Sequence, residues 1–194
     1  QSGQQDINMD KLRRMREYAE STVCRRRILL NYFGEQTDHD CGACDICENP
    51  PQRFDGTRYV QMALSAIKRT EENIRIATVI EILKGMHSPT IVRHGFDRLK
   101  TFGVGREITT NDWQDYLLQM MQMGYIEIAY NDKNKVKITE MGDDVLYGRK
   151  TVQLCVVDHH VNESQNRPKL KLEIPTITIP GLPSTTGVED AKLF

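Results

Sequence analysis

The spacing of the cysteines is the feature of this chain that most constrains its fold. Cys41, Cys44 and Cys47 form two overlapping C-x-x-C steps, and Cys24 lies upstream of them. Four thiolates are a typical tetrahedral ligand set for zinc, and Gly42 permits the tight turn that such a loop needs. Four protein ligands leave zinc no open position for catalysis. The spacing therefore predicts one structural Zn²⁺ ion whose binding contributes to folding.

Two other interpretations of the cysteine cluster are open at this point. The cysteines could form a reduced or redox-active cluster, and His39 could replace one of the ligands. The polar N-terminal segment has no apolar core of a signal peptide, so we expect a reducing compartment, where clustered cysteines usually bind metal. The fifth cysteine, Cys155, lies far from the others in the sequence.

Composition and charge narrow the class of protein. A chain of 194 residues with 39% hydrophobic residues can hold one medium domain, or two small ones and a tail. It contains no run approaching the roughly 18 apolar residues that span a bilayer, so we expect no membrane association. The formal net charge of −1 excludes a strongly basic nucleic-acid-binding protein, but it does not exclude basic patches on one face.

The hydrophobic pattern divides the chain into three parts. Residues 1–54 are expected to form a helical zinc-binding module, with helices over 10–23 and 24–33 before the metal loop. Residues 55–150 show several amphipathic helices and then a hairpin over 125–139. One of these helices is expected to begin near Asn111, with Asn111 as its cap. Helices followed by a hairpin are typical of a winged-helix domain. Residues 151–194 contain several prolines and are expected to form an extended linker. The predicted fold is mainly α with a small β-hairpin.

Three groups of residues are candidates for contacts with DNA. A glycine-containing loop could bring backbone N–H groups close to a phosphate, and the start of the following helix would favour an anion. Lysines on one side of the hairpin share a face. The candidates are Arg93, Lys100, Arg106, Thr109, Thr110, Asn111, Lys133 and Lys135.

Each of these groups could instead be a solvated surface that contacts no ligand. The three arginines at 25–27 cannot all address one row of phosphates, because a helix distributes consecutive residues around its circumference. Trp113 is expected in the core rather than stacked on a base. We find no phosphate-binding loop and no hydrolase motif, so we expect no catalytic residue in this chain.

Several motifs resemble the C-terminal region of the RecQ DNA helicases, especially the bacterial ones. The segment Cys24-Arg25-Arg26-Arg27-Ile28-Leu29-Leu30-Asn31-Tyr32-Phe33-Gly34-Glu35 and the cysteine loop resemble the zinc-binding module of that family. Phe54-Asp55-Gly56-Thr57, Gly95-Phe96-Asp97-Arg98-Leu99-Lys100 and Phe102-Gly103-Val104-Gly105-Arg106 resemble its winged helix. The segment 190–194 is similar to the start of the helicase-and-RNase-D C-terminal domain of the family.

The resemblance implies a fragment of an ATP-dependent helicase that unwinds DNA in the 3′ to 5′ direction in repair and recombination. The motor domains, which need ATP and Mg²⁺, would precede Gln1, so this chain alone should have no ATPase activity. It implies one zinc ion held by the four cysteines, and a winged helix that grips duplex, forked or junction DNA. The expected protein is a monomer in the bacterial cytoplasm, at the nucleoid.

Two other functional classes remain. The winged helix could be a protein-interaction module that docks a partner such as a single-strand-binding protein. A zinc-containing transcription regulator is a third possibility, but the helix after Asn111 is poor in the arginines that read bases. The hairpin turn is short and has no aromatic residue at its tip, so strand separation by this hairpin is not expected.

Overall fold

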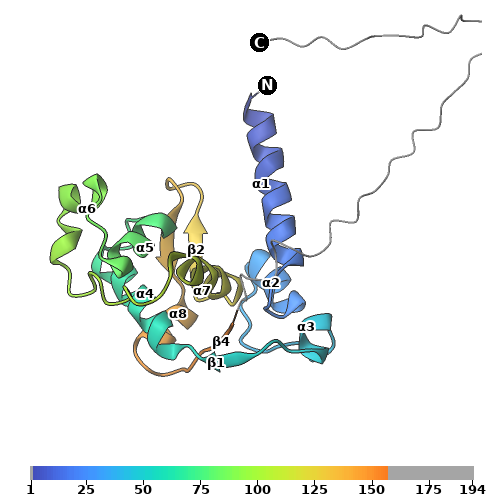
Figure 1. Ribbon diagram of the computed structural model, residues 1–194. Helices are drawn as coiled ribbons and strands as arrows, with labels where there is room; N and C mark the ends of the chain where they lie inside the picture. The colour runs from blue at the N-terminus through green and yellow to red at the C-terminus, as the bar shows by residue number, and fades with distance from the viewer. Residues whose placement is uncertain (1, 157–194) are drawn as a thin grey trace, which may run out of the picture. The chain divides into compact units, whose positions relative to one another are not determined.

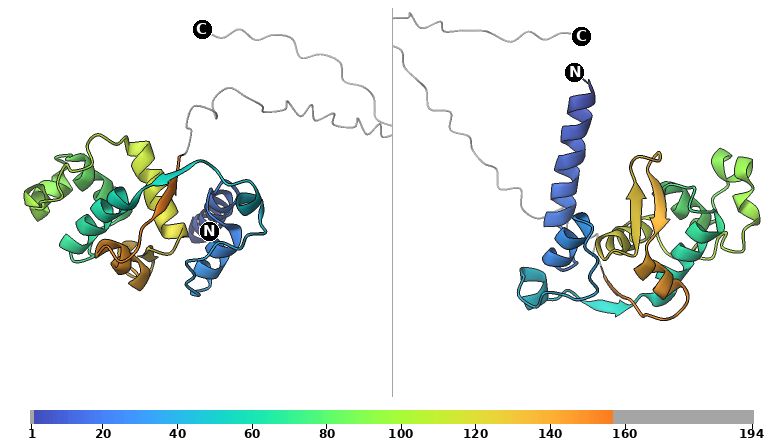
Figure 2. Two further views of the ribbon diagram at one scale, coloured as in Figure 1. Left: turned by 90° about the horizontal axis from the view of Figure 1, so that it is seen from below. Right: turned by 180° about the vertical axis from the view of Figure 1, so that it is seen from behind.

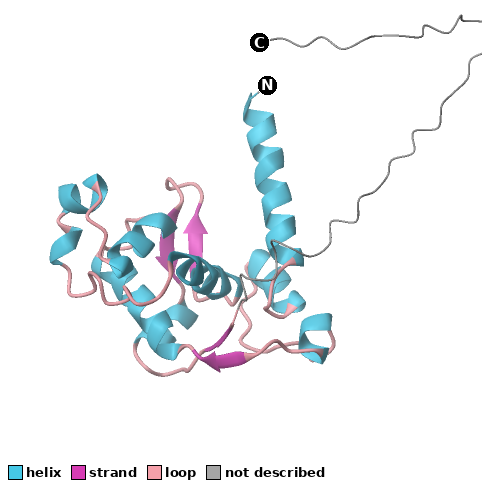
Figure 3. Cartoon of the chain, in the orientation of Figure 1, coloured by secondary structure: helices cyan, strands magenta, loops and turns pink. Residues whose placement is uncertain are grey.

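The computed structural model describes the backbone of residues 2–156 and, within that range, the side chains of residues 9 and 11–156. The described residues are about half helical and contain two small antiparallel pairs of strands (Figure 3). This agrees with the predicted fold class. Most of the expected linker, and the segment 190–194, lie outside the described residues.

The first module consists of the helices α1 (Ser2–Ala19), α2 (Arg25–Tyr32) and α3 (Asp45–Glu48), shown in Figure 1. The predicted start of the first helix at Asp10 was wrong, because the helix begins at Ser2. The residues upstream of Asp10 are mostly polar and include no proline, and polar residues such as glutamine are good helix formers. The predicted second helix is confirmed within one or two residues, and Gly34 follows it with a φ of +82°.

The second module contains the winged helix. Its helices are α4 (Thr57–Arg69), α5 (Ile76–Lys84), α6 (Pro89–His94), the short 3₁₀ helix η1 (Phe96–Arg98), α7 (Thr110–Gln122) and α8 (Glu140–Leu146). Strands β2 (Ile126–Ala129) and β3 (Lys135–Ile138) form the predicted hairpin. Ile126 pairs with Ile138, and Ile128 pairs with Val136, as their alternation predicts. Side chains of α4, α5 and α7 form most of the core, including Leu64, Ile82, Leu83 and Leu117.

A second strand pair was not predicted. Strand β1 (Arg53–Asp55) pairs antiparallel with β4 (Gln153–Cys155), so the packed unit continues beyond residue 150, where we expected the linker to begin (Figures 1 and 2). Leu154 is fully buried. A Cβ atom on Gly56 would lie 2.3 Å from Leu154 Cγ, so glycine at this position allows β4 to approach. Three-residue strands carry too short a pattern to be recognised in a sequence.

The zinc module and the winged helix meet along the C-terminal half of α7. Asn31 Nδ2 donates to Gln122 O at 2.8 Å, and Ser21 Oγ donates to Gln122 Oε1 at 2.8 Å. Gln119 bonds twice to the backbone of Cys155 in β4. The glutamine side chains at 119 and 122 therefore bond to the protein itself and are buried. Among the described helices, none is long and apolar enough to span a membrane.

Candidate metal centre and nucleic-acid interface

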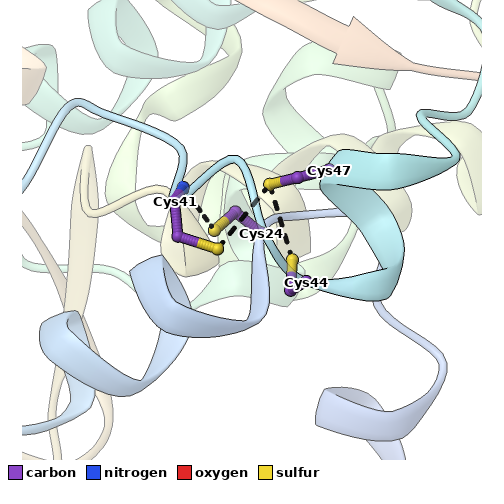
Figure 4. A group of neighbouring side chains, drawn as sticks. All are labelled: Cys24, Cys41, Cys44 and Cys47. Atoms are coloured by element: carbon purple, nitrogen blue, oxygen red, sulfur yellow. Dashed lines mark hydrogen bonds between the residues drawn. The ribbon is translucent and has the colours of Figure 1, made fainter.

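The structure brings the four predicted cysteines together at the start of α2 and around α3 (Figure 4). Their sulfur atoms all lie within 4.8 Å of one another. The Cys44–Cys47 and Cys41–Cys47 sulfur pairs are 3.4 and 3.9 Å apart. Zinc–sulfur bonds of about 2.3 Å in a tetrahedron place sulfur atoms about 3.8 Å apart. The cysteines are not in disulfides, and their arrangement fits one tetrahedral zinc ion.

Burial and hydrogen bonds shift the pKa values of two cysteines of the cluster in opposite directions. Burial alone would raise the pKa of the Cys44 thiol, but the backbone N–H groups of Arg25 and Cys47 lower it to about 6. Burial and the hydrogen bond with Cys44 raise the pKa of Cys47 to about 12. The Cys41 backbone N–H also donates to Cys24 Sγ at 3.3 Å. These N–H groups stabilise thiolate, which is the form of cysteine that binds zinc.

His39 does not take part in the cluster. Its side chain is 85% exposed and pairs with Asp38 at 3.1 Å. The alternative in which His39 replaces a cysteine ligand is therefore wrong. The redox interpretation is also less well supported, because four converging thiols match a metal ligand set better than a thiol–disulfide pair does.

The arginines at 25–27 point in three directions, as expected for consecutive residues of a helix. Arg25 pairs with Asp45 at 3.0 Å and donates to the carbonyl of Ala19, which ties α1, α2 and α3 together. Arg27 is buried and donates to Met123 O at 3.1 Å. Arg26 is exposed. Two of the three arginines therefore serve the packing of the zinc module.

The glycine loop does not offer its N–H groups to a phosphate. Gly103 N donates to Ile82 O at 2.7 Å, and Gly105 N donates to Leu83 O at 2.9 Å. These bonds satisfy carbonyls at the C-terminal end of α5. A Cβ atom on Gly105 would lie 2.3 Å from the ring of Trp113, so this glycine provides space for the tryptophan. The predicted phosphate cradle was wrong, because the loop geometry reflects packing.

Trp113 is a core residue, as expected. Its side chain is fully buried, and its indole N–H donates to Gly105 O at 2.9 Å. The rings of Tyr59 and Tyr116 lie edge-on to it, with centroids 6.3 and 6.0 Å away. Trp113 therefore cannot stack on a base.

The start of α7 differs in one detail from the prediction. Thr109, not Asn111, caps the helix, because Thr109 Oγ1 accepts from the Asp112 N–H at 3.1 Å. The Thr109 hydroxyl also donates to Asp112 Oδ2 at 2.7 Å. Thr109, Thr110 and Asn111 are exposed. Sequence reasoning missed Asp112, whose carboxylate lies in the first turn and opposes binding of a second anion there.

The structure places the basic candidates at the two ends of α5. At the C-terminal end, Lys84 Nζ donates to Arg106 O at 2.9 Å, and the Arg106 side chain is exposed. Arg93 in α6 and Lys100 after η1 are exposed on the segment that leads to this loop. At the N-terminal end, Arg75 Nε donates to Lys133 O at 3.0 Å, so the hairpin tip lies beside the start of α5.

The wing lysines are less accessible than their alternation suggests. Lys135 Nζ pairs with Asp132 at 2.7 Å, and this ammonium holds the pKa of the Asp132 carboxyl below its usual value. Lys137 Nζ donates to Glu72 O at 3.2 Å. Lys133 is exposed and has a φ of +54° at the turn. Sequence reasoning missed Arg75, which could only be found once the contact of the hairpin with α5 was known.

Comparisons with known proteins agree with this arrangement. The RecQ zinc-binding family model matches residues 1–48, and the RQC domain model matches residues 50–163. The chain is 33% identical over 79% of its length to the ATP-dependent DNA helicase RecQ of Haemophilus influenzae. It is 32% identical over 80% of its length to the RecQ of Pasteurella multocida, and 28% over 76% to that of Bacillus subtilis.

The matched region is a small part of these relatives. The chain spans 25% of the length of each of the three RecQ proteins. The two family models follow each other in the order of the zinc module and the winged helix, and together they cover almost all of the described residues. The chain therefore belongs to the RecQ family and comprises its zinc-binding and RQC region.

Proposed function

We propose that this chain is the DNA-gripping part of a RecQ-type ATP-dependent DNA helicase. The relatives carry the name of ATP-dependent DNA helicase, which supports this activity for the full protein. ATP and Mg²⁺ would act in motor domains and not on the residues described here. We propose that the protein acts as a monomer on forked or junction DNA at the bacterial nucleoid, in repair and recombination.

The observation that carries this proposal is the position of Arg106. Its guanidinium is held by Gly103, whose carbonyl accepts from Arg106 Nε at 3.1 Å. The exposed side chain of Arg106 lies three residues before the capped N-terminus of α7, where Thr109, Thr110 and Asn111 present hydroxyl and amide groups. Arginine and a helix N-terminus both favour phosphate. Arg106 and this turn would contact the DNA backbone.

A second set of contacts would come from the wing. Helix α5 has nine residues and separates Lys133 from Arg106. At about 1.5 Å per residue, its two ends are about 14 Å apart, which is close to the width of about 12 Å of a major groove. The two sets could thus contact phosphates on both sides of one groove. Backbone contacts of this kind position a duplex without reading its sequence.

The buried glutamines argue against sequence reading by α7. Gln119 and Gln122 are buried, and both bond to other parts of the protein. A recognition helix that reads bases needs exposed polar side chains along its length. The geometry therefore favours recognition of DNA structure over a transcription regulator.

Replacement of both Arg106 and Lys133 by alanine tests the proposed grip. We expect the double variant to bind a fluorescein-labelled forked duplex at least about tenfold more weakly at low salt, because two phosphate contacts are lost. In fluorescence anisotropy, the slope of log K against log salt should shrink by about 0.9 for each lost contact.

Arg58→Ala is the matched control for this double variant, because Arg58 is an exposed cation on α4 outside both sets. Each variant should keep its zinc content and its melting temperature. Unchanged DNA affinity in the double variant, combined with lost binding of a single-strand-binding protein, would support the protein-interaction module instead.

Asp112→Asn is expected to have the opposite effect. An asparagine at this position would keep a side-chain acceptor near the Thr109 hydroxyl but would remove the negative charge from the first turn of α7. A charge near a helix terminus is worth about 0.3–1 kcal/mol, so we expect forked-duplex affinity to rise about twofold to fivefold at low salt. The gain should disappear as salt screens the charge. An unchanged or weaker affinity would show that phosphate does not approach this turn.

A further inference from the structure

We propose that the groove between α1 and the β2–β3 hairpin binds single-stranded DNA that continues from the gripped duplex. This inference rests on the proposed DNA-binding function and assigns a second site to it. Helix α1 lies beside the hairpin in Figure 1, and Arg14 of α1 contacts the ring of Tyr130 in the hairpin. The space between them is a groove of about 680 Å³.

The groove combines positive charge with aromatic rings. Four basic residues line it, and two tyrosines stand among them: Lys11, Arg13, Arg14, Arg75, Tyr32 and Tyr130. Among the described side chains that line the groove, none is acidic, and Glu17 of α1, which does not line it, pairs with Arg13 at 3.7 Å. The whole chain has a net charge of −1, so the groove is a local excess of positive charge on a chain that is nearly neutral. A concave, positively charged surface focuses its field and attracts anions.

Contacts between the walls hold the groove in shape. The Arg14 guanidinium lies 4.4 Å from the centre of the Tyr130 ring, so α1 is joined to the hairpin by a cation–π contact. On the other side, Arg75 Nε donates to Lys133 O at 3.0 Å and fixes this arginine beside the hairpin turn. The cations therefore come from two separate parts of the chain, α1 and the residue that precedes α5.

The two tyrosines make single-stranded DNA the best match. Tyr32 is 67% exposed and Tyr130 is 50% exposed, so both rings can be reached from solvent. Bases of a single strand stack on such rings, and cations follow the backbone. An acidic peptide would use the cations but would gain little from exposed ring faces. A duplex keeps its bases stacked inside and offers no base to a tyrosine.

The position of the groove suits a strand that leaves a duplex. Lys133, which we assign to the duplex grip, lies at the hairpin turn, and its carbonyl accepts from Arg75 in the groove wall. A strand leaving the duplex at the wing would reach the groove directly. The hairpin would then serve both sites, with its tip toward the duplex and Tyr130 toward the single strand.

The experiment compares a blunt duplex with the same duplex carrying a 3′ or a 5′ single-stranded extension that contains 2-aminopurine. The variants are Tyr32→Ala and Lys11→Ala. Tyr147→Ala and Arg16→Ala are the matched controls, because they remove an exposed aromatic residue and an exposed cation that do not line the groove. Zinc content and melting temperature verify the fold of each variant.

We expect the wild-type chain to bind one of the extended duplexes more tightly than the blunt one, with a change in 2-aminopurine fluorescence. Tyr32→Ala should lower the ratio of the affinity for the extended duplex to that for the blunt duplex by at least about fivefold. It should also abolish the fluorescence change, because a stacked base is lost. Lys11→Ala should reduce the slope of log K against log salt for the extended duplex by about 0.7, because one phosphate contact is lost. Both controls should bind like the wild type.

The outcomes separate the two proposals. If the wild type binds the blunt duplex but gains nothing from either extension, the groove proposal fails while the duplex grip stands. If the gain survives in both groove variants, the single strand binds elsewhere and the groove proposal is again overturned. If no DNA binds at all and an acidic peptide binds in a Lys11-dependent way, the groove docks a protein and the proposed DNA function fails as well.

Discussion

Replacement of Cys24 by serine is expected to remove stoichiometric zinc from the purified chain and to unfold the zinc module. Cys24 is fully buried, and its sulfur is one of the four cysteine sulfur atoms that lie within 4.8 Å of one another. Structural zinc sites contribute on the order of 10–16 kcal/mol of apparent binding free energy, so the loss of one thiolate ligand outweighs the stability of a small domain. Elemental analysis and circular dichroism measure the two effects.

Cys155→Ser is the matched control for this variant. Cys155 is also a buried free cysteine, but its sulfur contacts the carbonyl of Thr22 and lies outside the cluster. We expect the Cys155 variant to keep one zinc ion per chain. If Cys24→Ser retained stoichiometric zinc, or if the wild type never contained it, the proposed metal centre would be refuted.

Trp113→Ala should cause the second large loss of stability. The ring is fully buried, contacts two tyrosines and donates to Gly105 O. Truncation of such a side chain costs about 3–5 kcal/mol. For a domain of this size that corresponds to a fall of about 6–20 °C in the melting temperature. Thermal unfolding followed by circular dichroism tests this value.

Tyr147→Ala is the control for Trp113→Ala, because Tyr147 is 65% exposed and its loss should change the free energy of unfolding by less than about 0.5 kcal/mol. In the wild type, Trp113 is the single tryptophan, so its fluorescence reports only on this site. Addition of DNA should leave the emission unchanged. Strong quenching by DNA would mean that Trp113 contacts a base, and the assignment to the core would be wrong.

The cysteine cluster and the hairpin could be predicted because each depends on a strong local pattern. Two overlapping C-x-x-C steps have few explanations other than a metal, and strict alternation in the hairpin fixes which side chains pair. The cap of α7 was misplaced by two residues, because both Thr109 and Asn111 are good N-cap residues and only the backbone decides between them.

Other features depend on contacts between distant segments. The pairing of β1 with β4 joins residues about a hundred positions apart, and neither strand is long enough to show a period. Gly103 and Gly105 suggested a phosphate loop, whereas their N–H groups bond to α5 and Gly105 provides space for Trp113. A glycine pattern indicates that some group lies close to the backbone. It does not indicate whether that group is a ligand or another part of the protein.

The burial of Gln119 and Gln122 in α7 has a consequence for the way such regions can be recombined. These two side chains and Asn31 bond the helix to both β4 and the zinc module. A zinc module transplanted onto an unrelated winged helix would lack the Gln122 side chain that accepts from Ser21, and the buried Ser21 hydroxyl would lose its bond. The two modules are therefore expected to be inherited and exchanged as one indivisible piece.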